Sequence, residues 1–168
     1  MAHAADAESY EKLLIQRVLN PIKLNDTRIT LNEPQRARLA TGHNALGRAT
    51  SPWTFGCLEA CGGLRSSAND MLKFADAALG RTDVLRNAFR MAHQRWRVID
   101  PQLESIGLCW FVRKLPSGLT MLWHNGGTGG YRSFLAIVPD RKIGVVVLSN
   151  SAHSVDEIAL SMVNALSD

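Results

Sequence analysis

The chain has 168 residues, of which 46% are apolar and 20% are charged, as in an ordinary globular protein that builds a hydrophobic core. No apolar run approaches the ~20 residues that a membrane-spanning helix requires. The first residues, MAHAADAESYEK, also lack the apolar centre of a signal peptide. We therefore expect no membrane span, and we assign the chain to no compartment.

The basic residues are only slightly in excess, with 19 Lys and Arg against 15 Asp and Glu. They are densest from Arg81 to Arg97, and Trp96 is the only aromatic residue among the arginines from 90 to 97. Nucleic-acid binding would require such a stripe together with stacking aromatics or a known binding motif. The composition instead favours a solvated helix face, so we expect no nucleic-acid partner.

The cysteines and histidines do not form a ligand pattern. Cys57 and Cys61 are spaced C-x3-C, and Cys109 has no second cysteine near it in the sequence. A zinc site would require a second pair of ligands, and the odd number argues against a disulfide framework. We interpret the three cysteines as small apolar fillers, and we expect no metal site and no cofactor.

The N-terminal part of the chain is predicted to be mostly helices and loops. Residues 8–19 have the apolar spacing of a helix that ends before a proline, whereas residues 20–65 show no sustained periodicity. Ser67 and Asp70 have the spacing of a capping box and predict the start of the next helix. A basic helix is expected to follow over residues 82–93.

The hydrophobic pattern of the sequence changes after Pro101, where apolar runs alternate with turn signals. Pro116-Ser117-Gly118 and Pro139-Asp140-Arg141 separate runs that are typical of hairpins. We therefore predict an antiparallel meander of about four strands, followed by a helix. The predicted strands cover residues 106–115, 119–124, 131–138 and 142–150, and the predicted helix covers 154–166.

The last predicted strand is apolar on both faces over residues 143–148, IGVVVL. Such a strand is normally covered on both sides and lies inside a sheet. As the last strand of a meander it would instead be an edge, which invites pairing with another chain. We expect a further strand to pair with residues 142–150, either from missing polypeptide or through self-association as a dimer.

The stretch WHNGGTGGYRSF, residues 123–134, places four glycines between a polar pair and the next strand. Glycines let a ligand approach the backbone closely and leave amide groups open to bind an anionic or carbonyl oxygen. A flexible glycine hairpin with an incidental histidine is the alternative. No G-K-[ST] follows, as a phosphate loop would require, and a strand rather than a helix comes next, against a dinucleotide site.

The stretch WHNGGTGGYRSFLAIVPDRKIGVVVLSN resembles the third active-site motif of the serine β-lactamase and penicillin-binding protein superfamily, with its flanking strands. That motif is K-T-G in many members and H-x-G in others. The most similar branch includes class C β-lactamases, D-alanyl-D-alanine carboxypeptidases and esterases. EACGGLRSSANDMLKFADAAL, YEKLLIQRVLNPIKLNDTRIT and IGLCWFV are similar to further segments of this family, in the same order.

The resemblance implies a partial β-lactamase/transpeptidase-like fold of class α/β (α+β). It describes residues 1–168 as one partial, C-terminal domain, with helices and loops over 1–100 and the antiparallel sheet and last helix over 101–168. In this family the nucleophile lies in an S-x-x-K motif, followed by Y-x-N or S-x-N. Both precede the segment that matches this chain, so we expect no nucleophile here. Ser9-Tyr10-Glu11-Lys12 has the S-x-x-K spacing but falls on the predicted first helix, which favours a helix cap.

The resemblance also implies roles for the residues of the glycine stretch. His124 would orient or protonate the substrate, or it would be a packed residue at a strand end. Asn125 would bind a substrate carboxylate or amide, and Gly126 would permit close approach. The N–H of Gly127 would be one oxyanion donor, and Thr128 would add a polar contact.

Two functional interpretations follow. In the first, the chain is part of a serine hydrolase that acts on a small β-lactam, an ester or a D-amino-acid peptide, and it is inactive alone. In the second, it is a non-catalytic module that binds a partner or itself through the open sheet edge. The family is often periplasmic or secreted.

Overall fold

The computed structural model describes residues 9–100 and 104–167, and its centre is a six-stranded antiparallel sheet with the order β3-β4-β5-β6-β7-β8. Each strand pairs with its neighbour in sequence, which confirms the predicted meander. The strands are β3 (Arg97–Asp100), β4 (Glu104–Ile106), β5 (Phe111–Lys114), β6 (Thr120–Thr128), β7 (Tyr131–Val138) and β8 (Ile143–Ser149).

The sequence predicted about four strands, and the two additional ones lie at its N-terminal end. Here the run 106–115 is not one strand, because the chain reverses over residues 107–110 and pairs Ile106 with Phe111. Cys109 adopts a positive φ of 60° in this turn. A Cβ on Gly107 would lie 2.7 Å from the carbonyl oxygen of Gln94, so only glycine fits beside the segment after α4. The apolar run 106–115 gives no sign of this tertiary contact, so the sequence predicted a single strand.

The helices largely follow the prediction. Residues 10–19 form an α-helix that continues as a π-helix. The helix was predicted over residues 8–19, and residue 8 lies outside the described residues, as do residues 101–103 and 168. No described helix is both long and apolar enough to cross a bilayer. The elements outside the sheet are α1 (Tyr10–Leu14), η2 (Ile15–Leu19), α2 (Glu33–Ala37), β1 (Gly42–His43), β2 (Ala49–Thr50), η3 (Gly56–Cys61), α3 (Ala68–Ala78), α4 (Arg86–Ala92), η4 (Pro139–Arg141) and α5 (Asp156–Ser167).

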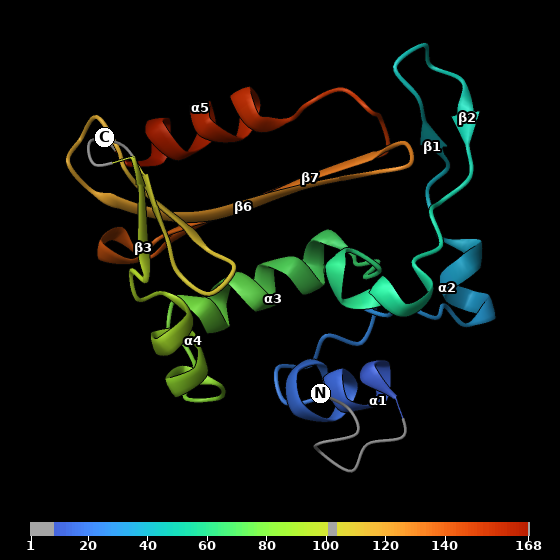
Figure 1. Cartoon of the computed structure of the whole chain (residues 1–168), viewed down its shortest axis with the longest axis horizontal. Helices are drawn as coiled ribbons and strands as arrows, with labels where there is room; N and C mark the ends of the chain where they lie inside the picture. The colour runs from blue at the N-terminus through green and yellow to red at the C-terminus, as the bar shows by residue number, and fades with distance from the viewer. Residues whose placement is uncertain (1–8, 101–103, 168) are drawn as a thin grey trace.

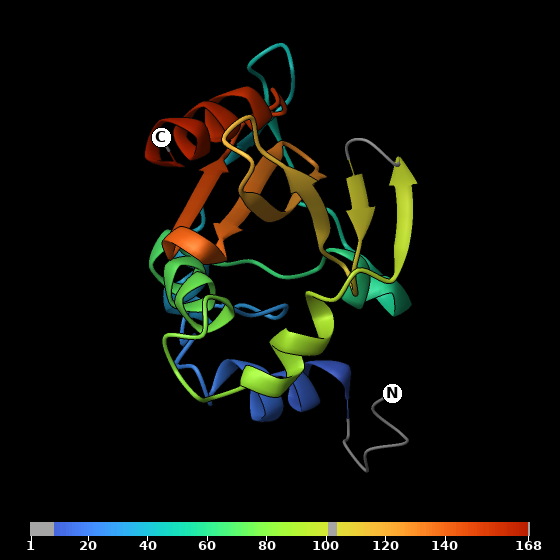
Figure 2. The same ribbon diagram turned by 90° about the vertical axis from the view of Figure 1, so that its left-hand side faces the viewer.

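Helices cover both faces of the sheet (Figures 1 and 2). α3 and α4 lie on one face, where Leu122, Leu135 and Ile137 join a core that also includes Trp110. α5 lies on the other face over a second core, whose buried members include Phe134. Neighbouring residues of one strand thus belong to different cores, as the alternation of a strand requires.

The loops before α3 are fastened to that helix by the buried carboxylate of Asp70, which is 2% exposed. It accepts hydrogen bonds from the backbone N–H of Asp26 at 2.7 Å and from Thr27 Oγ1 at 2.9 Å, and Lys73 Nζ lies 2.9 Å away. The predicted capping box therefore forms only in part. Ser67 Oγ accepts from the Asp70 N–H, whereas the Asp70 carboxylate anchors the loop instead of capping the helix.

Strand β8 is an edge of the sheet, as predicted, and both of its faces are covered by helices. α3 packs on one face and α5 on the other. A Cβ on Gly144 would already lie 3.2 Å from Ala75 of α3, which shows how closely that helix approaches. The helices explain why IGVVVL is apolar on both faces, while its outer backbone edge stays open.

The predicted role of the cysteines was wrong. Cys57, Cys61 and Cys109 are free and exposed, because they lie in η3 and in the turn between β4 and β5 rather than in a core. The described residues contain no group of three or more His, Cys, Asp or Glu side chains that could hold a metal ion.

We predict that the protein loses stability as the pH falls from about 6.5 to 4. Burial between Phe89 and Trp110 lowers the pKa of His93 to about 4, and its Nε2 has no hydrogen-bond partner. The unfolded chain therefore takes up a proton near pH 6.5, and the folded chain only near pH 4. The stability present above pH 6.5 is lost over this window, and because His93 is only partly buried, solvent screening limits the loss to about 2 kcal/mol.

Urea unfolding at pH 7.5, 6.5, 5.5 and 4.5 measures this loss. His93→Phe should flatten the dependence between pH 6.5 and 5, where the carboxylates stay ionised. His153→Gln is the control, because His153 is exposed and should leave the slope unchanged. An equal slope in His93→Phe would contradict the prediction.

Candidate active site

Strand β6 is longer than the strand before it, and this difference creates the candidate site. β5 pairs with β6 only as far as Phe111 opposite Trp123. β7 pairs with β6 as far as Thr128 opposite Tyr131. Residues 124–128 are therefore hydrogen-bonded on one edge and open on the other.

The ladder determines which backbone groups face the open edge. The Leu115 N–H donates to Leu119 O at 2.9 Å, which makes 115 and 119 a hydrogen-bonded pair. In an antiparallel ladder such pairs alternate, so odd-numbered residues of β6 point toward β5 and even-numbered ones toward β7. Beyond Trp123 the odd-numbered positions are Asn125 and Gly127. Their N–H and C=O groups point out of the sheet edge.

His124 is exposed on this stretch, so the packed strand-end alternative does not describe it. Its Nδ1 lies 2.6 Å from the carbonyl oxygen of Asn125, and its ring centroid is 5.5 Å from that of Phe111. The tautomer that carries the proton on Nδ1 donates to this carbonyl. That tautomer leaves Nε2 as a hydrogen-bond acceptor.

The side chain of Asn125 lies on the opposite face of the sheet from His124. Its Nδ2 donates to Asp156 Oδ2 at 2.9 Å, at the start of α5. The sequence analysis assigned this amide to a substrate, and that role stays a prediction. In the structure the amide ties the motif strand to α5.

The four glycines of the stretch have two different functions. Gly130 has a φ of +78°, and a Cβ there would lie 2.7 Å from the backbone nitrogen of His43. A Cβ on Gly129 would lie 2.6 Å from the Trp53 ring. These two glycines admit the neighbouring loops rather than a ligand, which corrects the interpretation of the whole stretch as a ligand approach. Gly126 and Gly127 remain on the open edge.

The end of β6 borders a cavity of about 830 Å³, which residues of β7 and β8 also line. All five predicted site residues, His124 to Thr128, line it. Opposite them lie loop residues 61–68, which include Ser66 and Ser67, and the segment around Trp53. The structure thus brings the predicted residues together on one wall of a cavity large enough for a small molecule.

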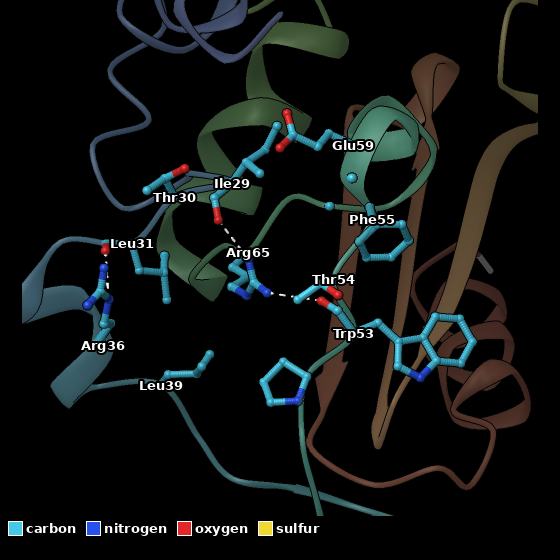
Figure 3. Close-up of a pocket in the computed structure, with 13 residues that line it drawn as sticks. Ile29, Thr30, Leu31, Arg36, Leu39, Trp53, Thr54, Phe55, Glu59 and Arg65 are labelled. Atoms are coloured by element: carbon cyan, nitrogen blue, oxygen red, sulfur yellow. Dashed lines mark hydrogen bonds between the residues drawn. The ribbon is translucent and has the colours of Figure 1, made fainter.

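A smaller pocket of about 390 Å³ adjoins this cavity and shares part of its lining (Figure 3). Arg65 crosses it, with NH1 donating to Ile29 O at 2.6 Å and NH2 to Trp53 O at 3.3 Å. Arg65 therefore joins the loop before α2 to the loop before η3. These bonds hold the far wall of the cavity.

An ion pair lies at the cavity margin. Arg38 NH2 is 2.6 Å from Asp26 Oδ1, and the hydrogen bond from Arg38 lowers the pKa of Asp26 below its ordinary value. Both side chains are exposed, so the pair contributes little to stability. It fastens the residues before β1 to the loop that Asp70 anchors.

Several residues around the motif were missed by sequence reasoning. Asp156 was assigned only to the start of a helix, and Arg132 was not singled out, although its guanidinium lies over Gly127 and its Nε donates to Ala152 O at 2.9 Å. Trp53 and Arg65 lie in a loop without periodicity. Their partners are remote in sequence, so no local pattern could have identified them.

The comparisons with known proteins identify the family of the chain. The family model "Beta-lactamase" matches residues 1–167. A β-lactamase of Pseudomonas fluorescens is 24% identical over 87% of this chain and 49% of its own length. A β-lactamase of Escherichia coli K12 is 25% identical over 86% of this chain and 47% of its own length. The chain thus spans about half the length of these relatives.

Solved structures share the fold. A class C β-lactamase superposes with a TM-score of 0.88 at 17% identity, covering 98% of this chain and 53% of that one. The octameric penicillin-binding protein homologue from Pyrococcus abyssi superposes with a TM-score of 0.82 at 22% identity, covering 98% and 39%. The chain has a β-lactamase-like α/β fold and belongs to the β-lactamase family, within the serine β-lactamase and penicillin-binding protein superfamily.

We predict that Gly130→Ala is far more destabilising than Gly118→Ala. Both glycines have a φ near +80°, but a Cβ on Gly118 has nothing within 4 Å. Gly118→Ala should cost about 1 kcal/mol of backbone strain. Gly130→Ala should cost about 3 kcal/mol, because the added Cβ also meets the backbone of Gly42 and His43. Urea unfolding of both variants measures the difference, and equal losses would contradict the close packing.

Proposed function

We propose that this chain supplies one wall of the acyl-transfer site of a β-lactamase-family serine hydrolase. The observation that supports it is the open edge of β6, where the backbone groups of Asn125 and Gly127 point out of the sheet and both residues line the cavity. A substrate carbonyl can accept a hydrogen bond from the Gly127 N–H, which is the arrangement of an oxyanion donor. A substrate N–H can donate to the Gly127 carbonyl, which points out of the same edge, in the manner of an added strand.

In this proposal His124 has a positioning role. Its Nδ1 engages the Asn125 carbonyl, so that Nε2 is available to a substrate or to the attacking group. Gly126 permits the close approach, and Thr128 adds a polar group at the end of the strand. The substrates we propose are β-lactams, esters and D-amino-acid peptides, in agreement with the family.

The attacking hydroxyl is proposed to come from polypeptide other than this chain, which would be the C-terminal part of a hydrolase. None of the serines that line the cavity, Ser66, Ser67, Ser133 and Ser149, is followed by a lysine three residues later. Ser9 does have this spacing, but its side chain accepts from the Lys12 N–H at 3.2 Å and caps α1. It does not line the cavity.

We predict that the chain alone hydrolyses neither nitrocefin nor a fluorogenic ester faster than its Ser9→Ala variant. Loss of one oxyanion donor lowers kcat by about 10²–10³, and loss of the nucleophile lowers it by about 10⁶. The rates of the two proteins should agree within error. Turnover that Ser9→Ala abolishes would identify Ser9 as the nucleophile and overturn this part of the proposal.

Ligand binding separates the catalytic wall from the non-catalytic alternative, a module that acts only through the edge at 142–150. In ¹⁵N-labelled protein, a β-lactam or an acylated D-Ala-D-Ala peptide should shift the amide signals of Asn125 and Gly127. The amides of His124, Gly126 and Thr128 face β7 and should shift less. The absence of shifts at millimolar ligand, or shifts confined to β8, would favour the alternative.

A further inference from the structure

A row of four rings leads from the core of the protein to His124. Phe134 of β7 is 1% exposed, and its ring stacks on that of Trp123, with 5.2 Å between the centroids and 13° between the planes. The ring of Phe111 lies 5.0 Å from that of Trp123 and 5.5 Å from that of His124. The imidazole of an exposed residue is thus connected to a fully buried ring.

Phe111 reaches His124 because of the place where β5 begins. Phe111 is the first residue of β5 and pairs with Trp123, so the side chains of these two residues share a face of the sheet. His124 comes next on β6, beyond the last residue that β5 pairs with. Its ring leans over the open edge, since Nδ1 reaches the carbonyl oxygen of Asn125, which points out of that edge. The imidazole therefore lies beside the free end of β5.

The two contacts of the imidazole fix different properties of the ring. The 2.6 Å distance from Nδ1 to the Asn125 carbonyl oxygen requires the proton on Nδ1, because a carbonyl oxygen can only accept. The Phe111 ring, inclined by 31° to the imidazole, restricts its rotation. Without such a neighbour an exposed side chain changes rotamer within nanoseconds, and water competes for its hydrogen bonds.

We propose that Phe111 is a positioning residue for His124. It holds the imidazole against the Asn125 carbonyl as the Nδ1–H tautomer, so that Nε2 is a hydrogen-bond acceptor at the wall of the cavity that His124 lines. This inference rests on the proposed acyl-transfer wall, because it assigns how His124 acts there. Phe111 acts only through His124 and is not itself a catalytic residue.

The tautomer determines which chemical groups His124 can bind. With the proton on Nδ1, a neutral imidazole can only accept at Nε2. Its partner is then a donor, such as the attacking hydroxyl or a substrate N–H, rather than a substrate carboxylate. A lysine, which many members of the superfamily carry at this position, can only donate. His124 therefore reverses the direction of the hydrogen bond, and Phe111 maintains that direction.

NMR of the chain labelled with ¹⁵N-histidine tests the tautomer without any need for activity. At pH 8.5, where histidine side chains are ordinarily neutral, a long-range ¹H–¹⁵N correlation distinguishes a protonated ring nitrogen from an unprotonated one. His124→Gln identifies the signals of His124 among those of the five histidines. The Nδ1–H form should exceed the Nε2–H form by about tenfold, as expected for a hydrogen bond of ordinary strength.

Three variants separate the Phe111 ring from the stability of β5. Phe111→Leu keeps an apolar side chain without the ring and should lower the tautomer ratio about fivefold. Phe111→Tyr keeps the ring and should stay within about twofold of the original ratio. Val112→Ala is the control, because it weakens the same strand on the face of the other core and should leave the ratio unchanged. Urea unfolding shows that each variant remains folded.

A predominant Nε2–H form in the unaltered chain would overturn the proposal, and so would an unchanged ratio in Phe111→Leu. An equal fall in Val112→Ala would attribute the effect to the strand and would overturn the role of the ring. The inference and the proposed function fail separately. A ligand that shifts the Gly127 amide, without any effect of Phe111→Leu on the tautomer, would overturn only the role of Phe111. The expected tautomer ratios without a ligand shift would overturn only the acyl-transfer wall.

Discussion

The candidate site depends on one constraint, the alternation of hydrogen bonds along β6. A strand in an antiparallel ladder divides its backbone groups between two neighbours. Because β5 begins only at Phe111, β6 loses one neighbour at Trp123 and keeps the other as far as Thr128. The outward N–H and C=O groups of Asn125 and Gly127 therefore have no neighbouring strand, as at the edge of a sheet. Everything we attribute to the motif follows from where β5 begins.

The sequence predicted the elements whose patterns are local. The strands at 119–124, 131–138 and 142–150 were identified because apolar runs stand between turn residues, and the last helix because its apolar residues recur at helical spacing. The reversal at 107–110 has no such signal. It results from the contact of Gly107 with the end of α4 and from the positive φ of Cys109, and the apolar run 106–115 conceals both.

The candidate site shows the same division. The position of His124 beside a glycine-rich strand edge could be predicted, because the residue types favour it and the resemblance to the family implies it. The separate functions of the glycines could not, since Gly129 and Gly130 are constrained by Trp53 and His43, about 80 residues away in sequence. The orientation of the Asn125 side chain likewise depends on its hydrogen bond to Asp156, which lies 31 residues later in the sequence. A glycine-rich composition predicts that the backbone packs closely against another group, but it does not identify that group.

The sheet has two open edges of opposite character, and their side chains determine what each can bind. Beside β6 the edge is short, it is lined by glycines and polar groups, and it borders a cavity, so a small polar ligand can reach its amides. Beside β8 the edge is flanked on both faces by exposed leucine, isoleucine and methionine, which water solvates poorly and a small ligand cannot bury. One ladder rule therefore leaves backbone groups unpaired at two edges of the sheet, beside a cavity at β6 and beside exposed apolar side chains at β8.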